Sequence, residues 1–200
     1  MTSHSQIGRA LVVTTALTAF ACSQPPVYMP PSPSPTAPAR PPAGRRAPAP
    51  LPGTSASAII RDLSGVRVGT ATLTDTYAGI LIVGSVVNLG LGAHGMHVHG
   101  VGKCVPPFST AGGHFNPLGK EHGFENPNGP HLGDLPNLDT PAAGALRFEV
   151  LLPGVTLEGT NALLDADGAA IVIHSARDDY KTDPAGDSGA RIACGVITRS

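Results

Sequence analysis

Six histidines and one aspartate are the residues of this sequence best suited to chemistry. They are His97, His99, His114, His122, His131, Asp134 and His174. Imidazole nitrogen and carboxylate oxygen are the usual ligands of zinc and copper, whereas calcium and magnesium need mostly oxygen ligands. A single histidine would more often be a hydrogen-bonded structural residue, but this many donor groups favour a metal site.

The spacing of these residues predicts how they reach a common point. His97 and His99 lie two residues apart in the sequence G-M-H-V-H. A β-strand directs residues i and i+2 to the same face, so both imidazoles can converge on one ion. His114, His122 and His131 are separated by segments that contain proline and glycine and are typical of loops.

The number of ligands leaves two arrangements open. Two four-coordinate ions need about eight ligand positions, and only seven groups are present. One imidazole could lose its second proton and bind a metal through each nitrogen. Alternatively, seven independent ligands could close a zinc site with four groups and leave an open position at the other metal. The spacing fits both.

Four motifs, in this order, resemble those of the copper/zinc superoxide dismutases. They are H-G-M-H-V-H at 94–99, A-G-G-H-F-N-P at 111–117, H-L-G-D-L at 131–135 and G-A-R-I-A-C-G-V-I at 189–197. The resemblance covers about residues 56–200. It implies an enzyme that holds copper and zinc and converts superoxide, a small-molecule substrate, to oxygen and hydrogen peroxide.

The resemblance also implies a role for each candidate residue. Copper would be bound by His97, His99, His114 and His174, and zinc by His114, His122, His131 and Asp134, with His114 as the bridging imidazolate. All seven ligand positions are filled, whereas some relatives lack copper ligands and with them the activity. Asp178 falls where the family places a carboxylate that links His97 to His122. His94 is not a ligand in this scheme, and we expect it to donate a structural hydrogen bond to a backbone carbonyl.

The family mechanism implies two catalytic residues, His114 and Arg191. Copper would be reduced by one superoxide and reoxidised by the next, while His114 is released and protonated on reduction and then gives that proton to the peroxide. Arg191 would bind the anion beside copper, although a surface salt bridge to the aspartates of 178–187 is an alternative.

The charge of the domain limits how superoxide can be attracted. Residues 56–200 carry 9 Lys and Arg against 14 Asp and Glu, a formal net charge of 9 − 14 = −5. Attraction of an anion must therefore come from local focusing at the metal and Arg191, with Lys181 as a further candidate. Nucleic acid is not expected as a partner, and a homodimer is left open.

The N-terminal region predicts export. An apolar run at 10–21 follows Arg9 and ends in A-F-A, as in a signal peptide spanning residues 1–21. Residues 22–55 form a proline-rich linker, with 12 prolines between positions 23 and 52, and the domain spans 56–200. We expect the protein in the periplasm or cell envelope.

The three cysteines have separate predicted roles. The resemblance implies a disulfide between Cys104 and Cys194, which would persist in an oxidising compartment. Cys22 directly follows the predicted cleavage site, the position that bacterial lipoproteins acylate. A lipid anchor at Cys22 would be the protein's contact with the membrane, and a free thiol or mixed disulfide is the alternative.

The positioning elements are predicted to be β-strands. Strand-like runs occur at 58–62, 66–74, 79–87, 95–99, 146–152, 170–175 and 190–198. Within each run, apolar residues either alternate with polar ones or are continuous, and turn residues separate the runs, as an all-β antiparallel sandwich or barrel requires. The resemblance specifies an eight-stranded Greek-key β-barrel. Two long irregular segments, 100–145 and 176–189, are expected to be functional loops.

Two other classes of protein use similar ligands. A copper-delivery protein would be expected to add a thiolate-rich transfer motif, and the linker has neither Cys nor His after Cys22. A zinc hydrolase would need an open zinc position and a general base, for which Glu121 beside His122 is the one adjacent glutamate.

Overall fold

The computed structural model describes residues 54–200, so the predicted signal peptide, Cys22 and nearly all of the proline-rich linker lie outside the described residues. Within this range the regular elements are β-strands and one turn of 3-10 helix, η1 (Ser109–Ala111). No helix among these residues is long and apolar enough to cross a membrane.

The strands form one large and one small antiparallel sheet. The seven-stranded sheet has the order β5 (Met96–His99), β8 (Ala170–His174), β9 (Arg191–Arg199), β1 (Ser55–Asp62), β2 (Arg67–Thr76), β3 (Gly79–Val87) and β7 (Ala145–Pro153). The two-stranded sheet pairs β4 (Gly92–His94) with β6 (Leu138–Thr140).

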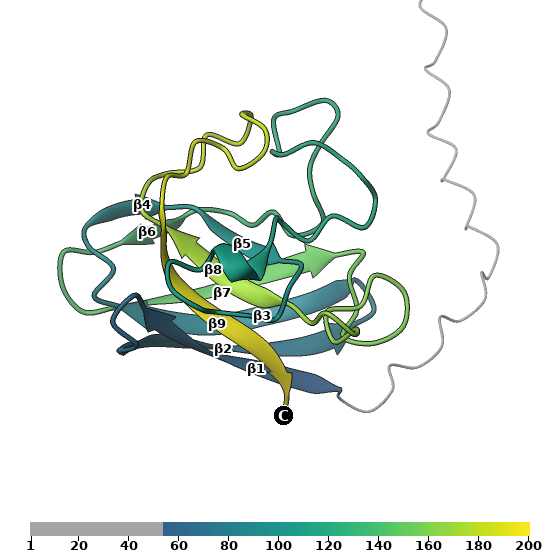
Figure 1. Ribbon diagram of the computed structural model, residues 1–200, viewed down its shortest axis with the longest axis horizontal. Helices are drawn as coiled ribbons and strands as arrows, with labels where there is room; N and C mark the ends of the chain where they lie inside the picture. The colour runs from purple at the N-terminus through teal and green to yellow at the C-terminus, as the bar shows by residue number, and fades with distance from the viewer. Residues whose placement is uncertain (1–53) are drawn as a thin grey trace, which may run out of the picture. The chain divides into compact units, whose positions relative to one another are not determined.

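The small sheet joins the two edges of the large one. β4 and β5 are a single extended stretch interrupted at Gly95, and they pair with β6 and β8 respectively. β6 also contacts β7, the opposite edge strand of the large sheet. The sheet therefore curls on itself (Figure 1), and with β4 and β5 counted as one strand the predicted eight-stranded antiparallel barrel is confirmed.

Strands β5 and β8 are buried on both faces, and this determines where the histidines lie. Met96, Val98, Ile171 and Ile173 belong to the main apolar core. The alternate residues Ala170 and Val172 belong to a second apolar cluster, formed with Phe108, Ala111 and Cys194. Because side chains alternate along a strand, His97, His99 and His174 share this second, outer face.

A disulfide holds the cover of this outer face in place. Cys104, in the loop after β5, is bonded to Cys194 on β9, 90 residues away. A cross-link that closes a loop of this length stabilises the fold by roughly 4–5 kcal/mol in the chain-entropy model. The bond fixes the segment that carries η1 over the ends of β5 and β8.

The predicted strands match the observed ones to within a few residues at their ends. Two three-residue strands were missed. β4 lies just before the predicted run 95–99, and β6 lies inside the segment 100–145, which reads as loop. Apart from η1 the remainder of that segment and residues 175–190 are irregular, and the loop that follows η1 rises from the same side of the barrel as the loop between β8 and β9 (Figure 1).

Candidate metal centre

Four histidines converge on the outer face of β5 and β8. His97 and His99 come from β5, His174 ends β8, and His114 follows η1 in the loop. One ring nitrogen of each lies within 4.8 Å of the others. His97 Nδ1 and the Nε2 atoms of the other three histidines are buried and have no hydrogen-bond partner. Buried polar atoms are nearly always paired, so four unpaired nitrogens facing one another fit the donor set of a bound cation.

The opposite nitrogen of each ring is held by the protein. His99 Nδ1 donates to the Gly112 carbonyl at 2.9 Å, and His174 Nδ1 donates to the Gly189 carbonyl at 3.2 Å. His97 Nε2 donates to the Asp178 carboxylate at 2.8 Å. Such bonds fix the ring orientation and leave the second nitrogen free to coordinate a metal.

Burial keeps these histidines in their neutral form. It lowers the pKa of His99 to about 2 and that of His174 to about 3. Burial also lowers the pKa of His114 to about 4, although the hydrogen bond from His114 to Asp134 acts in the opposite direction. A neutral imidazole is the form that coordinates a single metal, so little proton release is needed at His99 and His174.

A second group gathers around Asp134. The Nδ1 atoms of His114, His122 and His131 lie 2.8, 3.1 and 3.2 Å from Asp134 Oδ1. With zinc–nitrogen bonds of about 2.0 Å, the ligand atoms of a tetrahedral site are separated by about 3.3 Å. The spacing thus fits a zinc ion. Asp134 Oδ2 accepts hydrogen bonds from the backbone N–H groups of Gly123 and His131, each at 3.0 Å, which fixes the carboxylate.

His114 belongs to both groups. Its Nδ1 faces Asp134, and its Nε2 is one of the unpaired nitrogens of the first group. Its ring stacks on that of His97, with 4.0 Å between the ring centroids. This placement favours the shared-ligand arrangement over seven independent ligands.

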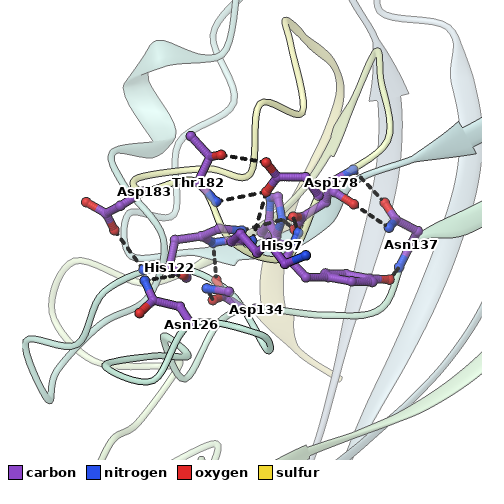
Figure 2. A network of polar contacts seen from close by, with 12 residues as sticks. His97, His122, Asn126, Asp134, Asn137, Asp178, Thr182 and Asp183 are labelled. Atoms are coloured by element: carbon purple, nitrogen blue, oxygen red, sulfur yellow. Dashed lines mark hydrogen bonds and ion pairs between the residues drawn. The ribbon is translucent and has the colours of Figure 1, made fainter.

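Asp178 connects the two groups (Figure 2). Its Oδ2 accepts from His97 Nε2 at 2.8 Å, and its Oδ1 accepts from His122 Nε2 at 3.0 Å. Burial would raise the pKa of Asp178, but the hydrogen bonds from His122 and His97 more than offset this effect and lower it. Burial alone would lower the pKa of His122, but its hydrogen bonds to Asp134 and Asp178 outweigh this effect and raise the pKa to about 9.

Arg191 lies beside His174 at the start of β9, where the two residues pair across a register shift. Its Nη1 donates to the Phe108 carbonyl and its Nη2 to the Gly112 carbonyl, both at 2.7 Å. Within the described residues it makes no ion pair, which counts against the salt-bridge alternative. A cavity of about 240 Å³ opens here, lined by Gly113, His114, Asn116, His131, His174, Pro184, Ala185 and Arg191.

The structure also gives the contacts of three other charged or polar residues that were considered in the sequence. Lys181 is paired with Glu125 at 2.7 Å, so its charge is compensated. His94 donates from Nδ1 to the His174 carbonyl at 2.8 Å, as expected for a structural histidine. Glu121 accepts a hydrogen bond from Asn126 and is absent from both metal-binding groups, which weakens the hydrolase alternative.

Comparison with known proteins agrees with this geometry. The family model described as copper/zinc superoxide dismutase matches residues 67–197. "Superoxide dismutase [Cu-Zn] 1" of Aquifex aeolicus is 50% identical over 137 residues, covering 66% of this chain and 81% of the relative. "Superoxide dismutase [Cu-Zn]" of Caulobacter vibrioides is 42% identical over 148 residues, covering 72% and 85%.

A solved structure shows the same fold. A superoxide dismutase-like protein from Bacillus subtilis superposes with a TM-score of 0.68 at 40% identity, covering 71% of this chain and 97% of that one. The family model spans well over half of the chain and includes every residue of the two histidine groups. The chain therefore belongs to the copper/zinc superoxide dismutase family, and its relatives named Cu-Zn superoxide dismutase are oxidoreductases that use copper and zinc.

Proposed function

We propose that this chain is an exported superoxide dismutase that cycles copper and keeps zinc as a structural partner. Copper would be held by His97, His99, His114 and His174, and zinc by His114, His122, His131 and Asp134. The observation that carries the proposal is the convergence of four unpaired, buried imidazole nitrogens beside a cavity that contains a guanidinium group.

When bound, copper supplies the one-electron redox step, which zinc cannot supply, so that two superoxide ions and two protons give oxygen and hydrogen peroxide. The protein's part begins with His114. Its Nδ1 is directed at Asp134 and the zinc group, which leaves Nε2 free to take up a proton and to deliver it to the peroxide product. Both His114 and His174 line the cavity through which the substrate would enter.

Arg191 is proposed to bind the superoxide anion. Its guanidinium has five N–H donors, and one each from Nη1 and Nη2 is used to anchor the group on the backbone of 108–112. The remaining donors can bind an anion in the cavity. Because Lys181 is neutralised by Glu125 and the domain has a net negative charge, the attraction of substrate would depend mainly on Arg191 and the metal.

We also propose the cellular arrangement. Residues 1–21 would be a signal peptide, Cys22 the lipid-anchored N-terminus, 22–55 a linker and 56–200 the catalytic domain. The Cys104–Cys194 disulfide supports an oxidising compartment such as the periplasm, because such bonds rarely persist in the cytosol.

The test is dismutase activity measured on the purified chain with its metals counted. We expect about one copper and one zinc per chain and rapid consumption of superoxide in pulse radiolysis. His174→Ala should retain zinc and the fold, since His174 is absent from the zinc group, but lose turnover. Retention of nearly full activity by this variant, or binding of zinc alone by the native chain, would contradict the proposal.

A further inference from the structure

Tyr180 has an unusual backbone conformation in the loop that follows β8. Its φ of +63° lies in the left-handed region, which bulky side chains rarely adopt. Such a conformation persists only when the surrounding contacts enforce it, and it occurs most often at functional sites. The contacts of Tyr180 therefore indicate what the conformation is for.

Tyr180 forms hydrogen bonds within its own loop and to two other segments of the chain. Its backbone N–H donates to Asp178 Oδ1 at 2.7 Å, and its carbonyl accepts from the backbone N–H of Glu125 at 2.9 Å. Its hydroxyl oxygen accepts from the backbone N–H of Asn137 at 2.7 Å. The ring also packs against Phe124, with 5.3 Å between the centroids. The residue thus joins the loop after β8 to the zinc-group segment and to the start of β6.

Asn137 holds Asp178 from the other side. Its side-chain Oδ1 accepts from the backbone N–H of Asp178 at 2.8 Å, and its Nδ2 donates to the Asp178 carbonyl at 2.9 Å (Figure 2). Tyr180 and Asn137 together therefore fix both the backbone and the Oδ1 atom of Asp178. That oxygen is the one that accepts from His122 Nε2.

The two loops meet closely enough that their positions are interdependent. Gly123 has φ +106°, and a Cβ atom at this position would overlap the Tyr180 carbonyl oxygen. Asp183 Oδ1 accepts from the backbone N–H of His122 at 2.7 Å, and Lys181 pairs with Glu125 at 2.7 Å. The backbone of this segment is thus held by the loop after β8, and the His122 ring cannot turn away from Asp134 without breaking its bond to Asp178 Oδ1.

We propose that Tyr180 is a positioning residue that slows the release of zinc by holding Asp178 and, through it, His122. This inference rests on the proposed zinc group and deepens it. Removing the hydroxyl leaves the Asn137 N–H without its partner, so the loop after β8 opens more often. Each opening frees the His122 ring to rotate.

The decisive variant is Tyr180→Phe, which keeps the ring and removes one oxygen. The chain is loaded with zinc, and the half-time for zinc transfer to an excess of a chromogenic chelator is measured. We expect the half-time to fall about tenfold, at the low end of the effect of mutating groups that orient a metal ligand. With Co²⁺ in place of zinc, the visible spectrum should match that of the native chain, because the ligands are unchanged.

Two further variants test the reasoning. Tyr77→Phe, at an exposed tyrosine between β2 and β3, should not change the half-time. Asn137→Ala removes both side-chain bonds to Asp178 and should also shorten it. In the double variant of Asn137→Ala and Tyr180→Phe, the half-time should fall by less than the product of the two single effects, because both substitutions act through Asp178.

The outcomes distinguish the role of Tyr180 from the assignment of the zinc ligands. If Tyr180→Phe releases zinc within twofold of the native rate, Tyr180 is not a positioning residue. The same conclusion holds if the faster release is fully explained by a lower unfolding midpoint of the metal-free variant. If the native chain binds no zinc, or Asp134→Ala holds zinc as firmly as the native chain does, the zinc group itself is wrong.

Discussion

The metal-free protein should lose much of its stability between pH 7 and pH 5. Burial lowers the pKa of His99, His114 and His174 to about 2, 4 and 3, whereas each has a pKa near 6.5 in the unfolded chain. At pH 5 these three groups are neutral when folded and protonated when unfolded. The unfolded state therefore binds more protons, and the free energy of unfolding falls as pH decreases.

The magnitude follows from the size of the window. The interval from the unfolded pKa of 6.5 down to pH 5 is about 1.5 pH units. At 1.36 kcal/mol per unit, each histidine lowers the free energy of unfolding by about 2 kcal/mol, or about 6 kcal/mol for the three. The pKa of His122 is raised to about 9, so its contribution is complete below pH 6.5 and is lost as pH rises towards 9. Going from pH 7 to pH 5 it returns only about 1 kcal/mol, which leaves a net loss of about 5 kcal/mol.

Urea unfolding followed by far-ultraviolet circular dichroism measures this loss on the metal-free chain with its disulfide intact. A loss of about 5 kcal/mol is comparable with the whole stability of many domains, so the midpoint should fall sharply. His174→Ala should lose about 2 kcal/mol less between the two pH values, since one buried histidine has been removed. Equal midpoints at pH 7 and pH 5 would show that these imidazoles are not held neutral in the folded protein.

Three other predictions test the remaining residues. Arg191→Glu should lower kcat/KM by about one to two orders of magnitude and weaken its decline with added salt, with copper and zinc contents unchanged, whereas the same charge reversal at the exposed Arg147 on β7 should have little effect. Loss of metal from Arg191→Glu would point instead to a structural role, through its bonds to the 108–112 segment. Cys22→Ser should move the exported protein from the membrane fraction to the soluble fraction, and native protein that is already soluble and lacks acyl chains by mass spectrometry excludes the anchor. His174→Ala should abolish turnover while zinc content stays at about one per chain.

The strands could be predicted as an antiparallel sandwich or barrel because they carry a periodic signal, and the resemblance specified the eight-stranded barrel. In β1 the buried residues Ala56, Ala58 and Ile60 alternate with more exposed ones, and this pattern can be recognised without any tertiary information. The pair His97 and His99 was equally clear, because residues i and i+2 of a strand share a face. β6 has only three residues, and its pairing with β4 is set by the path of the chain after the zinc-group segment.

The contacts of Tyr180 could not be predicted from its sequence neighbours. Its hydroxyl accepts from a backbone N–H 43 residues away, at Asn137, and a backbone donor leaves no mark on the sequence. The same holds for Arg191, whose anchors are the carbonyls of Phe108 and Gly112, 83 and 79 residues away. Both sets of contacts arise only when the loops have packed over β5 and β8.

The two metal groups differ in what holds them in place, and this difference explains the network around Asp178. Three of the four proposed copper ligands, His97, His99 and His174, project from β5 and β8, so their separation follows from the strand register. Of the proposed zinc ligands, His114 and Asp134 form backbone bridges to His99 and His97 of β5. The other two, His122 and His131, lie in the loop between these bridges. The position of His122 must therefore come from contacts between loops. The carboxylate of Asp178, fixed by Asn137 and Tyr180, joins His122 to His97 and so ties this less constrained ligand to the rigid sheet.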